Sequence, residues 1–354
     1  MWIKQIWMKY AVDKKNTSDV HGDSNHRYKK DFRIMAASDL HYLSPQLMEY
    51  RGKFRELCEA LQEPEMEHLE EFMEEWLDRV MEERPDLLLI TGDLSYQGEK
   101  LSHIQLAEKL NRLLRAGIPV YVIPGNQDMD NSFSACWRSS GDRDYTPVES
   151  VSPREFQEIY SSVGYGCSVG YGCRAGESCR AGEDCRAGEE GGEKVCGGHV
   201  MCVDREKSAV ISRAPDSLSY QVRLRKASGE ILHLFMLDTT IPGSPAGRIA
   251  PETFAWLEER LEKTGEEFPC LIAGHHPMLP LDEEAAPFVL ENGRALAGLM
   301  KKYGVPFYIS GHLHREGMVR YSETEAQKTG RKKILTGPVD PVNIYLEKRG
   351  LRLL

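Results

Sequence analysis

Several apolar runs along this chain end abruptly in carboxylate, imidazole or amide side chains, and at four of five such ends a glycine comes directly before the first of them. Carboxylate and amide oxygens together with imidazole nitrogens are ligands that suit Mn, Fe, Zn and similar divalent ions. The recurrence of these residue types therefore predicts a metal site. The side chains are, in chain order, Asp39, His41, Asp93, Asn126, His275, His276, His312 and His314.

The spacing within two of these blocks supports the same prediction. Asp39 and His41 are separated by one residue, as are His312 and His314. Alternate residues of an extended chain point to the same side, so both members of a pair can reach one ion. A single aspartate after a strand is usually a turn or helix cap, and a lone histidine is usually a satisfied polar residue. The joint pattern carries the prediction.

The elements that position these side chains can be read from hydrophobic periodicity. Continuous apolar runs such as "DLLLITGD" and "VYVIPGNQD" predict strands that are covered on both faces. Helical patterns alternate with them at 67–85, 102–119, 251–265 and 294–306, and Ser102 with Gln105 forms a candidate capping box. Alternation of strands and helices predicts an α/β domain, in which ligands gather beyond the carboxyl ends of the strands. Residues 332–354 are expected to be closing strands.

Five blocks in a fixed order, "SDLH", "GDLS", "GNQD", "GHHP" and "GHLH", resemble those of the calcineurin-like metallophosphoesterases. The resemblance runs from about Phe32 to His314. It implies a four-layer α/β sandwich, in which two packed mixed β-sheets are flanked by helices. It also implies two divalent metal ions, of Mn, Fe, Zn, Co or Ni, at the strand ends.

The resemblance assigns the ligands position by position. Asp39, His41, Asp93 and His314 are expected to hold one ion. Asp93 is expected to bridge to the second ion, which Asn126, His275 and His312 also hold. His275 is chosen over His276 because the family pattern is His-any-Pro, and Pro277 sets that frame. The implied activity is hydrolysis of a small phosphomonoester or phosphodiester by a hydroxide that bridges the two ions.

One position departs from the family pattern. The third block is usually Gly-Asn-His-Asp/Glu, and its histidine protonates the leaving group or contacts the phosphate; here Gln127 takes that place. A carboxamide donates hydrogen bonds but cannot act as a general acid near neutral pH, and general acid catalysis typically contributes about 10²–10⁴-fold. Asp128 stands where the family often keeps a carboxylate near that histidine. His276 is expected to support a metal ligand from behind, to contact the substrate or to replace the missing proton donor.

Four interpretations of Gln127 stay open. The enzyme uses substrates with good leaving groups; another group such as His276 supplies the proton; the protein has become a non-enzyme that binds a phosphorylated ligand through its metals; or Gln127 is a recent mutation or a sequence error. The intact ligand set favours a weakened or specialised enzyme over loss of function.

Composition limits the partners. The chain has 354 residues and a net charge of −10, so its surface as a whole does not attract nucleic acid or an anionic membrane. No apolar stretch has the length of a transmembrane helix, and the N-terminus lacks the features of a secretory signal. A cytoplasmic location is expected, with export as the alternative if the N-terminus is a remnant signal or anchor. The sequence does not indicate an oligomeric state.

The domain organisation has two irregular parts. Residues 1–30 are predicted to be a flexible leader, and residues 31–354 the metallophosphoesterase domain. Within it, 164–198 is rich in glycine and cysteine, with a six-residue repeat that places cysteines at 167, 173, 179 and 185. Structural zinc pairs have about two to four intervening residues, whereas these have five, so we expect a disordered insertion. A redox or metal-storage role is the alternative. Arg138, Arg143 and Arg248 are candidate phosphate contacts in loops.

Overall fold

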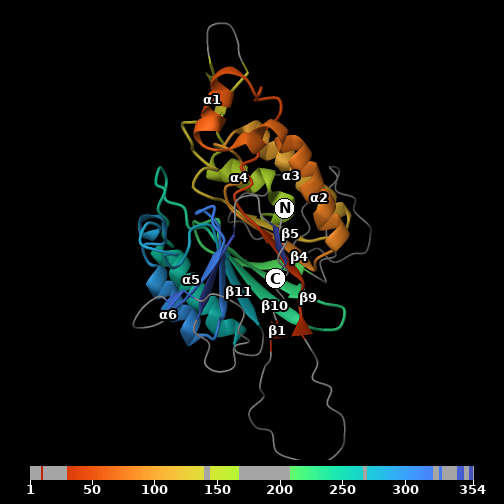
Figure 1. The fold of residues 1–354 in the computed structure, drawn as a ribbon. Helices are drawn as coiled ribbons and strands as arrows, with labels where there is room; N and C mark the ends of the chain where they lie inside the picture. Colours follow the sequence, from red (N-terminus) through yellow and green to blue (C-terminus); the bar gives the residue numbers. More distant parts are fainter. Residues whose placement is uncertain are drawn as a thin grey trace, which may run out of the picture.

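The computed structural model describes residues 9–10, 30–138, 144–166, 208–265, 269–321, 327–328, 341–346 and 351–353. The smaller of its two main β-sheets contains the first predicted strands (Figure 1). Strands β3, β4 and β5 are parallel, and β16 lies antiparallel to β3 at the edge. In sheet order the strands are β16 (Leu351–Leu353), β3 (Ile34–Ala37), β4 (Leu87–Thr91) and β5 (Val120–Ile123).

The larger sheet is mixed. Strands β10, β11, β12 and β15 are parallel to one another. Strands β9 and β13 pair antiparallel to β10 and β15, and β8 and β14 pair antiparallel to β9 and β13 in turn. In sheet order the strands are β14 (Gln327–Lys328), β13 (Gly317–Arg320), β15 (Val342–Tyr345), β12 (Phe307–Ser310), β11 (Cys270–Gly274), β10 (Ile231–Leu237), β9 (Tyr220–Arg225) and β8 (Ser208–Arg213). Two short pairs lie outside these sheets: β1 (Lys9–Tyr10) with β2 (Lys30–Asp31), and β6 (Ala135–Cys136) with β7 (Thr146–Pro147).

Helices cover the outer face of each sheet. Figure 1 shows α2 and α3 on one side of the strands and α5 and α6 on the other, with α1 and α4 near the top. The α-helices are α1 (Gly52–Ala60), α2 (Leu69–Glu83), α3 (Lys100–Arg115), α4 (Pro153–Ile159), α5 (Pro251–Thr264) and α6 (Gly293–Lys302). The 3₁₀ helices are η1 (Pro64–His68), η2 (Ser161–Val163) and η3 (Ala286–Phe288).

The side chains of β10 show how the layers are held together. Leu234 and Met236 belong to the core shared with the smaller sheet, whereas Phe235 and Leu237 belong to the core under α5 and α6. Both faces of this strand are therefore buried, as its continuous apolar run predicts. The sheets also meet through Tyr220 in β9, whose hydroxyl donates to the carbonyl of Val122 in the edge strand β5 over 2.7 Å. The four-layer α/β sandwich is confirmed.

Helix α2 follows its predicted stripe, but the start of α3 does not follow the predicted cap. Helix α2 buries Leu69, Met73, Trp76, Leu77 and Val80 on one face. Helix α3 begins at Lys100, so Ser102 lies inside it. The Ser102 hydroxyl oxygen accepts the backbone N–H of Ser44 over 3.1 Å, and the predicted capping box is therefore wrong. A contact between distant parts of the chain uses the group that a local cap would need.

The closing strands predicted at the C-terminus are present as β15 and β16, which lie in different sheets. The cysteine repeat and most of the predicted leader lie outside the described residues, so those predictions stay as they are. At the start of the predicted insertion, Tyr165 is buried and Arg213 donates to the carbonyls of Gly164 and Gly166. In the described part of the chain, no helix has the length and apolar character needed to cross a bilayer.

Candidate metal centre

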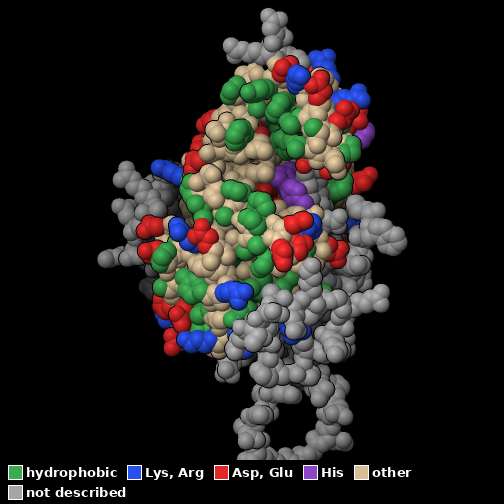
Figure 2. All heavy atoms as spheres, turned by 60° about the vertical axis from the view of Figure 1, so that its left-hand side comes forward, with side chains coloured by type: hydrophobic (Ala, Val, Ile, Leu, Met, Phe, Trp, Pro, Cys, Tyr) green, Lys and Arg blue, Asp and Glu red, His purple; other side chains and the backbone are tan. Residues whose placement is uncertain are grey.

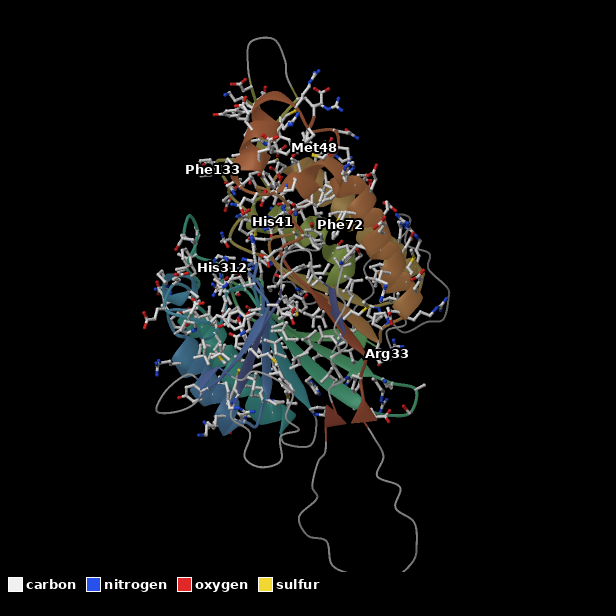
Figure 3. The ribbon with its side chains drawn as sticks, in the orientation of Figure 1. Arg33, His41, Met48, Phe72, Phe133 and His312 are labelled. Atoms are coloured by element: carbon white, nitrogen blue, oxygen red, sulfur yellow. The ribbon has the colours of Figure 1, made fainter. Side chains whose placement is uncertain are left out.

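The seven side chains expected to bind metal lie together where the carboxyl ends of five strands meet. Asp39 and His41 follow β3, Asp93 follows β4, and Asn126 follows β5, all from the smaller sheet. His275 follows β11, and His312 and His314 follow β12, in the larger sheet. Figure 3 shows His41 and His312 approaching from the two halves, and Figure 2 shows histidines in a hollow on this face.

The backbone at these strand ends differs from the predicted geometry. Asp39 and His41 lie beyond the end of β3 and have positive φ values of 54° and 43°, so the expectation of an extended chain is wrong here. Of the nine non-glycine residues with positive φ in the described ranges, five belong to the expected ligand set. Left-handed backbone is unfavourable for such residues and clusters at functional sites, where the surrounding structure holds it in place. Besides Asp39 and His41, the expected ligands with positive φ are Asp93, His312 and His314.

The first group of ligand atoms surrounds the ring nitrogens of two histidines. His41 Nε2 lies 3.1 Å from His314 Nε2. Asp39 Oδ1 lies 3.5 Å from His314 Nε2 and 4.0 Å from His41 Nε2. Asp93 Oδ2 is 3.9 Å from His41 Nε2. These four residues are the set that the resemblance assigned to one ion.

The second group surrounds the ring of His275. Its Nε2 atom lies 3.0 Å from Asn126 Oδ1, 3.1 Å from His312 Nδ1 and 3.4 Å from Asp93 Oδ2. The same oxygen of Asp93 therefore reaches both groups. That placement is the one a carboxylate needs in order to bridge two ions.

The separations of these atoms fit coordination spheres. With bonds of about 2.1 Å, neighbouring ligand atoms of a tetrahedral or octahedral ion are about 3.0–3.4 Å apart, and opposite ones about 4.2 Å. The observed range, from 3.0 Å for Asn126 with His275 to 4.0 Å for Asp39 with His41, matches these values. The Nε2 atoms of His41 and His314 lie 3.1 Å apart, a separation that suits two nitrogen ligands of one ion. The donor set fits two divalent ions.

Burial and charge shape the protonation of this cluster. Burial opposes ionisation of Asp93, but His275 and His41 outweigh it and hold the pKa of Asp93 well below its usual range. Burial likewise disfavours a charged His275, yet Asp93 and Asp39 raise the pKa of His275 to about 9. The Nδ1 atom of His275 lies 2.9 Å from the carbonyl oxygen of Thr91. A hydrogen bond there keeps one proton on Nδ1, so that the second proton, on Nε2, is the one that an ion would displace.

Two glycines permit the close approach of the loops. A Cβ atom on Gly125 would lie 2.2 Å from Asp93 Oδ1 and 2.3 Å from the Asp93 backbone nitrogen. A Cβ atom on Gly311 would lie 1.8 Å from Ser38 Oγ and 2.3 Å from Asp39 Oδ2. Both positions therefore require glycine because of contact with a neighbouring loop that carries an expected ligand.

His276 lies beside the cluster but is covered. Its side chain is buried, its ring centroid is 4.6 Å from that of His312, and its Nδ1 lies 2.8 Å from Thr239 Oγ1. A Cβ on Gly247 would meet its Cγ at 2.3 Å. Burial and the neighbouring His275 lower the pKa of His276 well below its usual value. This environment favours support of the His312 ring over direct contact with substrate.

Asp128 joins the loops that follow β4 and β5. Its Oδ2 accepts the backbone N–H groups of Gly125 and Leu94 over 2.8 and 3.1 Å, and its Oδ1 accepts that of Ser95 over 2.9 Å. Burial and the charge of Asp93 raise the pKa of Asp128 to about 7, and the backbone donors oppose that rise. The carboxyl group is engaged by the loops that carry Asp93 and Asn126, which favours a positioning role.

Sequence reasoning missed the buried partner of these loops, His103 in α3. His103 Nε2 lies 2.9 Å from both Ser95 Oγ and the carbonyl oxygen of Asp128, and His103 Nδ1 lies 2.8 Å from the hydroxyl of Tyr160. Burial lowers the pKa of His103 to about 4, so the ring is neutral at physiological pH. A lone histidine inside a helix gives no signal in the sequence.

Gln127 lies at the rim of the cluster. Its backbone N–H donates to Asp93 Oδ1 over 3.0 Å, and its side chain is half-buried. Among the candidate phosphate contacts, Arg248 pairs with Glu291 at 3.6 Å, Arg138 donates to the carbonyl of Pro45 over 3.3 Å, and Arg143 lies outside the described residues.

Comparison with known proteins adds the family. A family model described as calcineurin-like phosphoesterase matches residues 32–316. The glycerophosphodiester phosphodiesterase GpdQ of Enterobacter lignolyticus (strain SCF1) is 32% identical over 92 residues, which are 25% of this chain and 33% of that protein. The match thus spans a third of the curated relative.

Solved structures of low identity are also similar. One is a dimetal phosphatase from Danio rerio, at 12% identity and a TM-score of 0.46, with 89% of this chain and 87% of that chain covered. Another is the purple acid phosphatase PPD1 from yellow lupin (Lupinus luteus) seeds, at 12% identity and a TM-score of 0.49, with 90% and 44% covered.

Proposed function

The chain belongs to the calcineurin-like phosphoesterase family, and from that premise we propose that it hydrolyses phosphodiesters with two divalent metal ions. The ions are held by the seven side chains of the cluster, from Asp39 to His314. The substrates have leaving groups that depart without a proton from the enzyme. The diester class is supported by the relative from Enterobacter lignolyticus, which is named as a glycerophosphodiester phosphodiesterase.

One observation carries the proposal. Two groups of nitrogen and oxygen atoms, each spaced like a coordination sphere, share Asp93 Oδ2, which lies 3.9 Å from His41 Nε2 and 3.4 Å from His275 Nε2. A shared carboxylate is what distinguishes a dinuclear site from two separate ones. The family implies the same arrangement.

The metal ions, when bound, supply Lewis acidity that polarises the phosphoryl group and makes water acidic enough to react. The chain's own residues prepare that site. Asp39 and Asp93 provide the negative charge that retains the cations, and the Thr91 carbonyl fixes the ring of His275. The backbone N–H of Gln127 on Asp93 holds its side chain at the rim, where an amide can donate a hydrogen bond to a phosphoryl oxygen.

Gln127 also limits the substrate. Its amide has no proton to give to a departing alkoxide, and His276, the other candidate donor, is buried against Thr239 and His312. Aryl and other weakly basic leaving groups need no such proton. The site is therefore suited to them more than to simple alcohols.

A second candidate function follows from the same residue. A protein that retains its metals but lacks an acid can bind a phosphorylated ligand without cleaving it. Gln127 in place of the family's histidine is the observation that favours this alternative.

Turnover separates the two candidates. The purified full chain is loaded in turn with Mn, Co, Ni, Fe or Zn, its metal content is measured, and an aryl phosphodiester and an aryl phosphomonoester are offered. Hydrolysis that is lost in Asp93→Asn and kept in Asp78→Asn, an exposed position on α2, supports the proposal. Saturable phosphate binding without product from any loaded form refutes it and supports the alternative.

A further inference from the structure

Three carboxamide side chains form a hydrogen-bonded chain at the rim of the metal centre. Asn131 Nδ2 donates to Gln97 Oε1 over 2.8 Å and to the backbone carbonyl of Gln127 over 3.2 Å. Gln97 Nε2 faces Gln127 Oε1 at 3.5 Å, which is longer than the usual ~2.7–3.2 Å of an N–H···O hydrogen bond. Such contacts at reaction sites often shorten when a ligand binds.

The direction of this chain is fixed at its far end. The backbone N–H of Phe133 donates to Asn131 Oδ1 over 2.9 Å, and a backbone N–H can only donate. Asn131 must then turn Nδ2 toward Gln97, and Gln97 must meet it with Oε1. The end of Gln97 that remains for Gln127 is therefore Nε2, a donor.

It follows that Gln127 meets Gln97 with its acceptor oxygen and keeps Nε2 for the other side. We infer that Gln97 and Asn131 are positioning residues that orient Gln127 as a hydrogen-bond donor to a phosphoryl oxygen of the substrate. The inference rests on the proposed function, because it needs an anionic ligand at the metals. With the amide reversed, Gln127 would present a lone pair to that anion.

The backbone of each member is held as well. The N–H of Gln97 donates to Glu99 Oε2 over 3.0 Å, and that of Asn131 donates to Ser150 Oγ over 3.0 Å. Gly98, at φ 78°, packs so closely that a Cβ there would lie 3.1 Å from the Gln127 carbonyl oxygen. The three hydrogen-bonded carboxamides are thus preorganised before a ligand arrives, which lowers the entropic cost of binding.

Two substitutions reverse the orientation of the Gln127 amide without replacing Gln127 itself. Gln97→Glu keeps an acceptor for Asn131 but offers Gln127 a carboxylate oxygen, so Gln127 turns Nε2 toward it. Asn131→Asp keeps the acceptor for Phe133 but removes the donor to Gln97, so Gln97 and then Gln127 turn over. Because a hydrogen bond to an anion is lost in both, we expect the dissociation constant of inorganic phosphate to rise about tenfold.

The test is calorimetric titration of the metal-loaded full chain with inorganic phosphate, which does not require turnover. Gln127→Ala should raise the dissociation constant about as much. In that background, Gln97→Glu and Asn131→Asp should change it by less than about twofold. Gln46→Glu, an exposed position with the same change of charge, should leave it unaltered in the wild-type background.

Several results would overturn the inference. They are an unchanged phosphate affinity in both variants, a full-size effect that persists in the Gln127→Ala background, or a loaded wild-type protein that binds no phosphate. If one variant fails to fold, the other decides alone, since one changes Gln97 itself and the other changes the donor to its Oε1. Failure of the proposed function is separate, because it shows as phosphate binding without hydrolysis.

Discussion

Replacement of Gln127 by histidine tests the missing proton donor. The structure indicates how an imidazole would be oriented at this position. Gln97 Nε2, which lies 3.5 Å from Gln127 Oε1, would donate to one ring nitrogen and leave the N–H of the other directed toward the metals. Asp128 cannot take that role, because its oxygens accept the backbone N–H groups of Gly125, Leu94 and Ser95.

The size of the effect follows from the chemistry of the leaving group. A general acid typically contributes about 10²–10⁴-fold, or about 3–5 kcal/mol of the barrier. An amide is a weaker orienting partner than a carboxylate, because it does not stabilise an imidazolium by charge. We therefore expect Gln127→His to raise kcat/KM for an alkyl phosphodiester by about 10²-fold, and for an aryl phosphodiester by less than about threefold.

The assay compares both substrates on protein of equal metal content. Gln46→His is the matched control, since it adds an imidazole at an exposed position, and it should change neither rate. Equal acceleration of both substrates would refute the reasoning, because it would mean that residue 127 does not stand next to the leaving group. No acceleration of either would refute it as well.

Three further predictions concern the architecture of the site. Gly125→Ala should lower kcat/KM by about 10²-fold or more, because its Cβ would push the Asp93 loop by about 1 Å, and wild-type kinetics in this variant would contradict the prediction. The control is Gly298→Ala, at an exposed position of α6 with open space, which should instead stabilise the fold by about 0.5–1 kcal/mol. Removal of metal by a chelator should lower the free energy of unfolding by about 2.7 kcal/mol per site at free metal about 100 times Kd, with no such loss in Asp93→Ala, as calorimetric melting would show. In chelated protein, His103, whose pKa is about 4 against 6.5 for the unfolded chain, should contribute stability that is fully present above pH 6.5 and declines by up to about 3 kcal/mol toward pH 4. Denaturant titrations of His103→Gln should show a shallower decline, and an identical slope would contradict the assignment.

The clustering of the expected ligands could be predicted from sequence because each block is contiguous and ends a strand. Asp39, Asn126 and His312 needed no knowledge of tertiary structure beyond the meeting of strand ends. The backbone conformation that presents these side chains could not be predicted without the tertiary structure. The alternate spacing of Asp39 and His41 suggested an extended chain, whereas the structure uses left-handed residues held by the facing loop, such as the His41 N–H on the Asp93 carbonyl at 3.0 Å.

The supporting residues could not be predicted, because their roles depend on partners far along the chain. Asp128 is next to Gln127 in sequence, yet its carboxyl group is engaged by Leu94 and Ser95. Ser102 has the residue type of a helix cap, yet it accepts from Ser44. Gln97 is 34 residues from Asn131, and nothing local marks either as part of one hydrogen-bonded chain.

The sheet order shows the same limit at the level of the fold. Strand β15 lies between β12 and β13, although β13 precedes it in the chain, and β16 joins the smaller sheet beside β3. Apolar runs define that strands exist and that both faces are covered. They do not define which strands pair, because the same pattern suits several orders.

The central claim is that two ions share Asp93. Electron paramagnetic resonance of protein loaded with two equivalents of Mn²⁺ tests it most directly, since Mn²⁺ favours oxygen and nitrogen ligands over cysteine sulfur. We predict the spectrum of a magnetically coupled Mn pair in the wild-type protein and its loss in Asp93→Ala. Isolated Mn²⁺ ions in the wild-type protein, or a coupled pair that survives in Asp93→Ala, would contradict the account.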